Sequence, residues 1–121
     1  MGGEYKVVFV TVDEDRPRLN HLTGLVIRAF PGCVVYQYSN PMCAVLNTVN
    51  REIDAVLLSA GASQKNNWQL LSVICRERPG LQVIVLSDDD QLRETALKSG
   101  AWDYLTRPLT GQKLQDALLA V

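Results

Sequence analysis

The chain has 121 residues, of which 47% are hydrophobic and 21% are charged, and its formal net charge is −1. This length and composition predict one globular domain over residues 1–121. A balanced charge without a block of like charges argues against a nucleic-acid or membrane surface on this domain. The first residues lack the apolar run of a signal peptide and no stretch is long enough to span a bilayer, so we expect a cytoplasmic location.

The residues that most often hold metals or form disulfides are few. The three cysteines, Cys33, Cys43 and Cys75, are an odd number without the spacing of a metal site. We therefore expect reduced thiols in the core of the domain. The single histidine, His21, excludes a histidine-based metal cluster and is expected on a helix surface.

The first half of the chain alternates apolar runs with helical patterns. Residues 7–12 are apolar and mostly β-branched, which is typical of a strand buried on both faces of a parallel sheet. Apolar residues at three- and four-residue steps over 19–29 predict a helix that stops at the following Pro-Gly pair. Residues 33–38 predict a second strand, and Ser-Asn-Pro at 39–41 predicts the start of a helix that continues to about residue 49.

The same alternation continues in the second half. Residues 55–58 predict a third strand, and the helical pattern over 67–78 again ends at a Pro-Gly pair. Residues 83–86 predict a fourth strand. A run of three aspartates then favours the start of a helix over 88–98, and Gly100 suits the left-handed position that follows a helix.

The last elements are a short strand over 102–105 and a helix that Thr110 can cap. The chain ends within an apolar helical pattern over 118–121, so we expect the natural protein to continue beyond Val121. Strands that alternate with helices form βαβ units with right-handed crossovers. We therefore predict a flavodoxin-like, doubly wound α/β sandwich, (βα)5, with a parallel sheet in the order 2-1-3-4-5.

Ligands of such a sheet collect beyond the carboxyl ends of its strands. An acidic cluster that faces a hydroxyl and a cation there is the arrangement that holds a divalent metal and a phosphoryl group. The strand ends of this chain carry these residues, in order: Asp13, Glu14 and Asp15, then Ser59, Ser87 and Arg107.

Three segments give the chain a resemblance to the CheY-like receiver domain of two-component response regulators, over essentially its whole length. Residues 54–59, Asp-Ala-Val-Leu-Leu-Ser, are similar to the family's third strand, which normally ends in the phosphorylated aspartate. Residues 85–87, Val-Leu-Ser, resemble the strand that ends in the switch serine or threonine. Residues 100–108 resemble the family's Gly-Ala…Tyr-Leu-x-Lys-Pro signature.

The resemblance implies roles for several residues. Ser87 and Tyr104 would stand at the switch positions, although a local strand-end hydroxyl and an exposed edge-strand tyrosine are the simpler readings. Arg107 would stand at the position of the family's lysine, with a cis peptide before Pro108. Asn67 would replace the glycine of the loop before the third helix, where a positive φ is expected.

The departures from the family pattern carry the functional interpretation. Ser59 stands at the position of the phosphoacceptor aspartate, and a serine hydroxyl without a base is a weaker nucleophile and a poorer metal ligand. Arg107 keeps the positive charge, but its planar fork prefers to pair with carboxylates and can fill the pocket. Gly-Ala-Ser at 61–63 replaces the family's proline-rich loop motif. The acidic pair is either Asp13 with Glu14, which the strand pattern favours, or Glu14 with Asp15.

Three functions follow from these patterns. The favoured one is a phosphorylation-independent pseudo-receiver of a bacterial response regulator, not an enzyme, without Mg²⁺ or another cofactor. It would act by protein contact or dimerisation on an output domain beyond Val121, with transcription as the regulated process. The contact surface would consist of the helix over 88–98, the strand over 102–105 and the last helix. The alternatives are a receiver that phosphorylation or metal still switches through a substitute residue, and a cofactor-binding domain, for which no glycine-rich phosphate loop is present.

Overall fold

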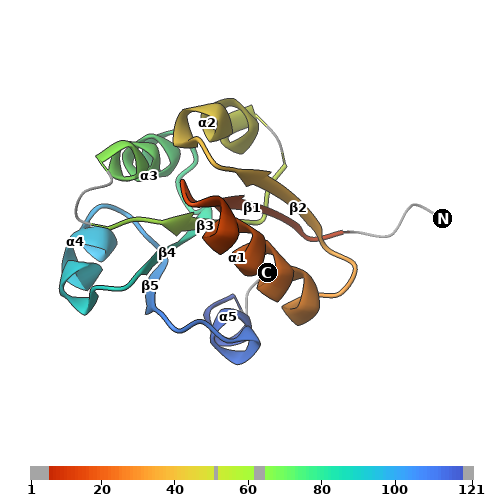
Figure 1. Ribbon diagram of the computed structural model, residues 1–121. Coiled ribbons are helices and arrows are strands. Elements are labelled where there is room, and N and C mark those ends of the chain that lie inside the picture. The colour runs from red at the N-terminus through yellow and green to blue at the C-terminus, as the bar shows by residue number, and fades with distance from the viewer. Residues whose placement is uncertain (1–5, 51, 62–64, 119–121) are drawn as a thin grey trace.

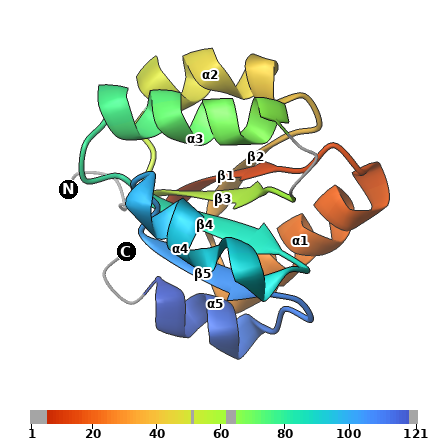
Figure 2. The ribbon, with the colours of Figure 1, turned by 90° about the vertical axis from the view of Figure 1, so that its left-hand side faces the viewer.

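Five parallel strands form one sheet in the order β2-β1-β3-β4-β5, with helices on both of its faces (Figures 1 and 2). The computed structural model describes residues 6–50, 52–61 and 65–118. The flavodoxin-like architecture and the strand order are as the sequence predicts. The strands are β1 (Val8–Val12), β2 (Val34–Tyr38), β3 (Ala55–Ser59), β4 (Gln82–Ser87) and β5 (Asp103–Thr106).

Two helical layers cover the sheet. Figure 2 shows α1 and α5 on one side of the sheet and α2 and α3 on the other. The buried side chains form two clusters that match these layers, and α4 contributes to the cluster of α2 and α3. None of the described helices has the length and apolar character that crossing a membrane requires. The helices are α1 (Arg16–Ala29), α2 (Pro41–Asn50), α3 (Lys65–Glu77), the short 3-10 turn η1 (Asp90–Leu92), α4 (Arg93–Lys98) and α5 (Gly111–Ala117).

The central strands are apolar throughout because both of their faces are buried. In β1, Phe9 packs with the layer of α1 and α5, and Val10 packs with the layer of α2 and α3. All five residues of β3 are buried. This strand lies between β1 and β4, so the residue at its carboxyl end, Ser59, is held in the middle of the sheet edge.

Local signals fix the ends of several helices. Asp15 caps α1 by accepting a hydrogen bond from the Arg18 N–H at 3.0 Å, and Thr110 caps α5. Gly100 has a φ of +108°, and a Cβ at this position would lie 2.8 Å from Cys75 Sγ. The predicted left-handed glycine after α4 is therefore confirmed, and it is required by packing as well as by backbone conformation.

Several details differ from the sequence prediction. Asn67 lies inside α3, and no non-glycine residue of the described part of the chain has a positive φ. The acidic run at 88–90 leads into a 3-10 turn that begins at Asp90, so α4 begins only at Arg93. All three cysteines are free, but Cys43 is exposed on α2 and does not belong to the core. Two predicted features, most of the loop at 61–63 and the apolar pattern after Leu118, lie outside the described residues.

Candidate functional site

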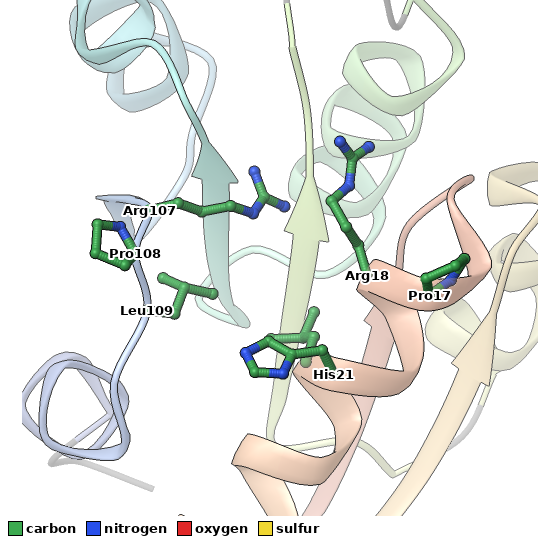
Figure 3. Close-up of a pocket in the computed structure, with 7 residues that line it drawn as sticks. Pro17, Arg18, His21, Arg107, Pro108 and Leu109 are labelled. Atoms are coloured by element: carbon green, nitrogen blue, oxygen red, sulfur yellow. The ribbon is translucent and has the colours of Figure 1, made fainter.

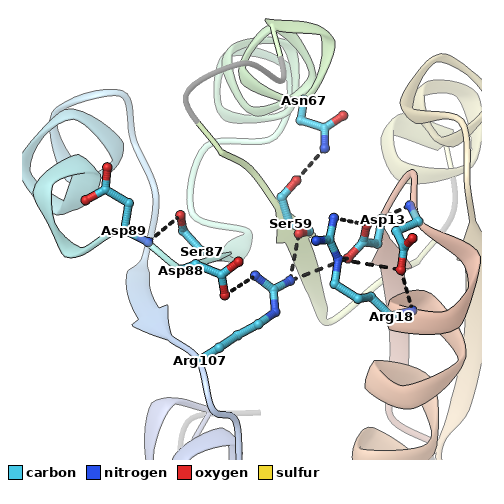
Figure 4. Close-up of polar contacts among 9 residues, drawn as sticks. Asp13, Arg18, Ser59, Asn67, Ser87, Asp88, Asp89 and Arg107 are labelled. Carbon is cyan, nitrogen blue, oxygen red and sulfur yellow. Dashed lines mark hydrogen bonds and ion pairs between the residues drawn. The ribbon is translucent and has the colours of Figure 1, made fainter.

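Polar side chains from four strands and two helices meet at the carboxyl edge of the sheet (Figure 4). Asp13 follows β1, Ser59 ends β3, Ser87 ends β4 and Arg107 follows β5. Arg18 reaches the same edge from the first turns of α1 (Figure 4). Parallel strands place their carboxyl ends together, so the topology explains why residues almost a hundred positions apart are neighbours.

Asp13 is the buried carboxylate of the site, with no exposed surface. Arg18 holds both of its oxygens, with Nε 3.1 Å from Oδ2 and Nη2 3.2 Å from Oδ1. Arg107 Nη2 lies 3.4 Å from Oδ2, and the backbone N–H of Asp15 donates to Oδ1 at 2.9 Å. The two carboxylate oxygens are therefore occupied by donors from the protein itself, as a buried charge requires.

Ser59 is almost completely buried beside this carboxylate. Its Oγ accepts a hydrogen bond of 2.8 Å from Arg107 Nη2, and its backbone carbonyl accepts one from the side-chain amide of Asn67. Among the residues that the structure describes, the Asn67 Oδ1 atom has no hydrogen-bond partner. The serine hydroxyl thus faces a guanidinium group, and the asparagine fixes the backbone at the end of β3.

Arg107 connects the two sides of the site. The same guanidinium that donates to Ser59 and contacts Asp13 also lies 3.5 Å, through Nη1, from Asp88 Oδ1 in the loop after β4. The Arg107 side chain is 22% exposed, and the peptide bond between it and Pro108 is cis. Its planar fork spans the space between strands, which a lysine ammonium group cannot do with a single nitrogen.

The other acidic residues of the run after β1 lie outside this cluster. Glu14 is exposed, and Asp15 caps α1 and lies 3.8 Å from Arg18 Nε. Only Asp13 of the three is buried in the site. The pKa of the Arg18 guanidinium is raised above its ordinary value, mainly because Arg18 donates hydrogen bonds to the Asp13 carboxylate. Burial opposes this shift.

Ser87 and Tyr104 are both buried, and both contact the loop after β4. Ser87 Oγ accepts a hydrogen bond from the Asp89 N–H at 3.1 Å, which is the local strand-end contact of the simpler reading. The Tyr104 hydroxyl donates to the backbone carbonyl of Asp89. The alternative reading of Tyr104 as an exposed edge-strand tyrosine is wrong, because the ring is fully buried with the Arg93 guanidinium 5.3 Å from its centroid.

The donor set of the site does not fit a divalent metal ion. Mg²⁺ needs oxygen ligands from carboxylates with free lone pairs. Here one buried carboxylate has both oxygens bound by guanidinium groups, and the neighbouring hydroxyl already accepts from Arg107. Within the described residues no group of three or more His, Cys, Asp or Glu side chains is placed to hold a metal.

The fold and this edge arrangement define a signalling domain of the CheY-like class. The chain belongs to the response regulator receiver domain family, whose model matches residues 8–119. Receiver domains are regulatory modules. The family membership that the sequence patterns indicate is therefore confirmed.

Individual relatives are distant. The chain is 26% identical over 115 residues to the transcriptional regulatory protein MalR of Bacillus subtilis (strain 168), covering 93% of this chain but only 49% of MalR. It thus spans about half the length of this curated relative. A solved structure from Burkholderia thailandensis E264, named for pilus assembly (cpaE), is 26% identical with a TM-score of 0.79, covering 94% of this chain and 96% of that one.

A further structural relative shows the fold alone. It is a response regulator from Burkholderia pseudomallei with a phosphorylated aspartic acid, a calcium ion and citrate, which is 22% identical with a TM-score of 0.78. The match covers 93% of this chain and 66% of that chain.

Sequence reasoning identified Asp13, Ser59 and Arg107 but missed two members of the cluster. Arg18 is not among the strand-end residues that the sequence indicates, although its place in the first turns of α1, five residues after Asp13, is a signal for it. Asn67 was assigned a backbone role in a loop, whereas its side chain bonds the Ser59 carbonyl from inside α3.

Proposed function

We propose that this domain is a phosphorylation-independent pseudo-receiver, which regulates through protein contact rather than through an acyl phosphate. One observation carries the proposal: Arg107 Nη2 lies 2.8 Å from the Oγ of Ser59, at the position where the family resemblance places the phosphoacceptor. The arginine and the serine together occupy the place that a carboxylate and a phosphoryl group would need.

The chemistry of Ser59 supports this proposal. A serine attacks phosphorus only when a base removes its proton. Within the described part of the chain, the side chain that hydrogen-bonds Ser59 Oγ is a guanidinium, which is a donor and accepts no proton. The nearby Asp13 carboxylate is bound to both Arg18 and Arg107, so it is poorly placed to serve as that base.

The output is proposed to run through the surface formed by α4, β5 and α5. Leu97 on α4 and Trp102 before β5 are 43% and 52% exposed, so this surface offers two apolar side chains to a partner. Self-association or contact with an output domain beyond Val121 would cover them. The relation to MalR favours transcription as the regulated process, and a cytoplasmic location follows from the same reading.

A second output is favoured by the relation to the structure named for pilus assembly. In that case the domain would contribute to an assembly machine instead of a DNA-binding regulator. The sequence of the full-length gene product distinguishes the two, because a DNA-binding domain in it supports the first output and a different second domain supports the other.

The test is incubation of the purified protein with Mg²⁺ and a small phosphodonor, followed by intact mass. An aspartate-bearing receiver domain in the same reaction is the positive control. We expect the control to gain a phosphoryl group and this protein to gain none. A phosphoryl group on this protein overturns the proposal, and its loss in Ser59→Ala would assign it to Ser59.

A further inference from the structure

A cavity of about 330 Å³ lies next to the site, between α1 and the segment that connects β5 to α5 (Figure 3). It is distinct from the buried contact between Ser59 and Arg107 because it opens on the surface of the molecule. Its lining includes Arg18, His21 and Leu22 from α1 and Arg107, Pro108 and Leu109 from the connecting segment.

The charges that line the cavity have one sign. Both charged side chains of its lining are arginines, His21 adds an imidazole, and no carboxylate belongs to the lining. The carboxylates that hold the arginines are Asp13, Asp15 and Asp88, and none of them lines the cavity. Among the described residues Arg18 Nη1 and Arg107 Nε have no hydrogen-bond partner, so both arginines keep a donor for a further acceptor.

The rest of the lining is apolar. Leu22, Leu109 and the ring of Pro108 form it together with Pro17. In the view of Figure 3 the two guanidinium groups lie toward one end of the cavity, and His21 and Leu109 lie toward the other. A cavity of this kind, with a few convergent polar groups on an apolar wall, is the usual form of a small-molecule site. Its volume suits a metabolite-sized molecule rather than a dinucleotide.

We propose that this cavity binds a small organic anion, a carboxylate or a phosphate with a compact apolar body, as the signal that replaces phosphorylation. The anionic group would accept hydrogen bonds from Arg18 and Arg107, and the apolar body would pack on Leu22, Pro108 and Leu109. This inference rests on the proposed function, because the arginines are available to an external ligand only while no phosphoryl group occupies the site.

The experiment is titration of the ¹⁵N-labelled protein with four probes, followed by amide chemical shifts. The probes are benzoate, phenyl phosphate, inorganic phosphate and the neutral benzyl alcohol, at millimolar concentrations and constant ionic strength. We expect benzoate or phenyl phosphate to shift the amides of α1 and of residues 106–110 with saturation. Inorganic phosphate lacks the apolar body and benzyl alcohol lacks the anionic group, so each should bind at least about tenfold more weakly than the aromatic anions.

Three variants with the same change in net charge locate the site. Arg18→Gln and His21→Glu should each weaken binding by about tenfold or more, and His21→Glu does so without touching the bonds of Asp13. Arg28→Gln, at the exposed far end of the same helix, is the matched control and should bind like the unchanged protein.

Two results would overturn the inference: no saturable shift at the cavity with either aromatic anion, or an equal loss of binding in Arg28→Gln. Tight binding of inorganic phosphate alone, or of benzyl alcohol alone, would also contradict an organic anion as the ligand. Intact mass after phosphodonor treatment is a separate readout. A phosphorylated protein that does not bind the probes therefore refutes the proposed function, whereas an unphosphorylated protein that does not bind them refutes only the cavity assignment.

Discussion

Replacing Arg18 and Arg107 by glutamine, singly and together, tests how the buried charge of Asp13 is compensated. Asp13 has no exposed surface, so its carboxylate depends on partners within the protein. Either arginine remains in contact with Oδ2 when the other is removed. We therefore expect the double variant to lose more stability than the two single variants combined.

The size of each effect follows from the contacts that are lost. Arg18→Gln removes two hydrogen bonds to the carboxylate, but the arginine side chain is 43% exposed, so solvent screening limits the loss to about 1–2 kcal/mol. Arg107→Gln removes the bond to Ser59 and a longer contact to Asp13, a loss of about 1 kcal/mol. The double variant leaves a buried carboxylate without a cation, which costs about 3–5 kcal/mol.

Urea denaturation of the four proteins measures these differences as shifts of the midpoint at constant slope. The expected coupling between the two positions is about 1–2 kcal/mol. Arg28→Gln controls for the removal of one positive charge from α1 and should stay within about 0.5 kcal/mol of the unchanged protein. Additive losses would refute the reasoning, because they would show that the two arginines do not share the compensation of Asp13.

Two further predictions concern glycine and cysteine positions. Gly100→Ala should destabilise the protein by about 1–3 kcal/mol in urea denaturation, because the new methyl group meets Cys75 Sγ at a residue with a positive φ. Gly80→Ala is the control, since Gly80 also has a positive φ but a methyl group there meets nothing within 4 Å, so this variant should lose less stability. Equal losses in the two variants would exclude the contact with Cys75 as the cause. Alkylation with iodoacetamide, followed by peptide mass, should modify the exposed Cys43 first. Burial raises the pKa of Cys33 and Cys75, so the thiolate fraction of these two residues is lower at a given pH. Their modification should therefore accelerate only at higher pH. Simultaneous modification of all three cysteines at neutral pH would contradict this prediction.

The fold could be predicted because its signals are local. Apolar runs buried on both faces distinguish the strands, and three- and four-residue steps distinguish the helices. The caps at Asp15 and Thr110 and the left-handed Gly100 depend on a few adjacent residues, so they are also readable from sequence. Boundaries were less certain where a 3-10 turn replaces the first turn of α4, since the acidic run favours both kinds of helix start.

The site could be predicted only in part because its contacts are tertiary. The strand ends identify Asp13, Ser59 and Arg107, since the topology alone brings them to one edge. Whether Arg18 turns back to Asp13 depends on the angle between β1 and α1, which no sequence pattern specifies. The position of Asn67 depends on where α3 begins after a loop, and a shift of a few residues changes its role from a backbone turn to a side-chain donor.

The charges of the cluster connect the two proposals. One buried carboxylate faces two guanidinium groups, and the remaining contact of Arg107, Asp88, is 70% exposed and therefore well screened. Asp15, 3.8 Å from Arg18, is exposed and screened as well, so the local excess of positive charge is confined to the two guanidinium groups around the single buried carboxylate. A divalent cation would add charge of the same sign and would have to displace two arginines from Asp13, whereas an anion would relieve the imbalance without breaking either contact. An aspartate at position 59 would reverse this preference by placing a second buried carboxylate beside Arg107, so the serine accounts both for the poor fit of a metal and for an adjacent surface that favours anions.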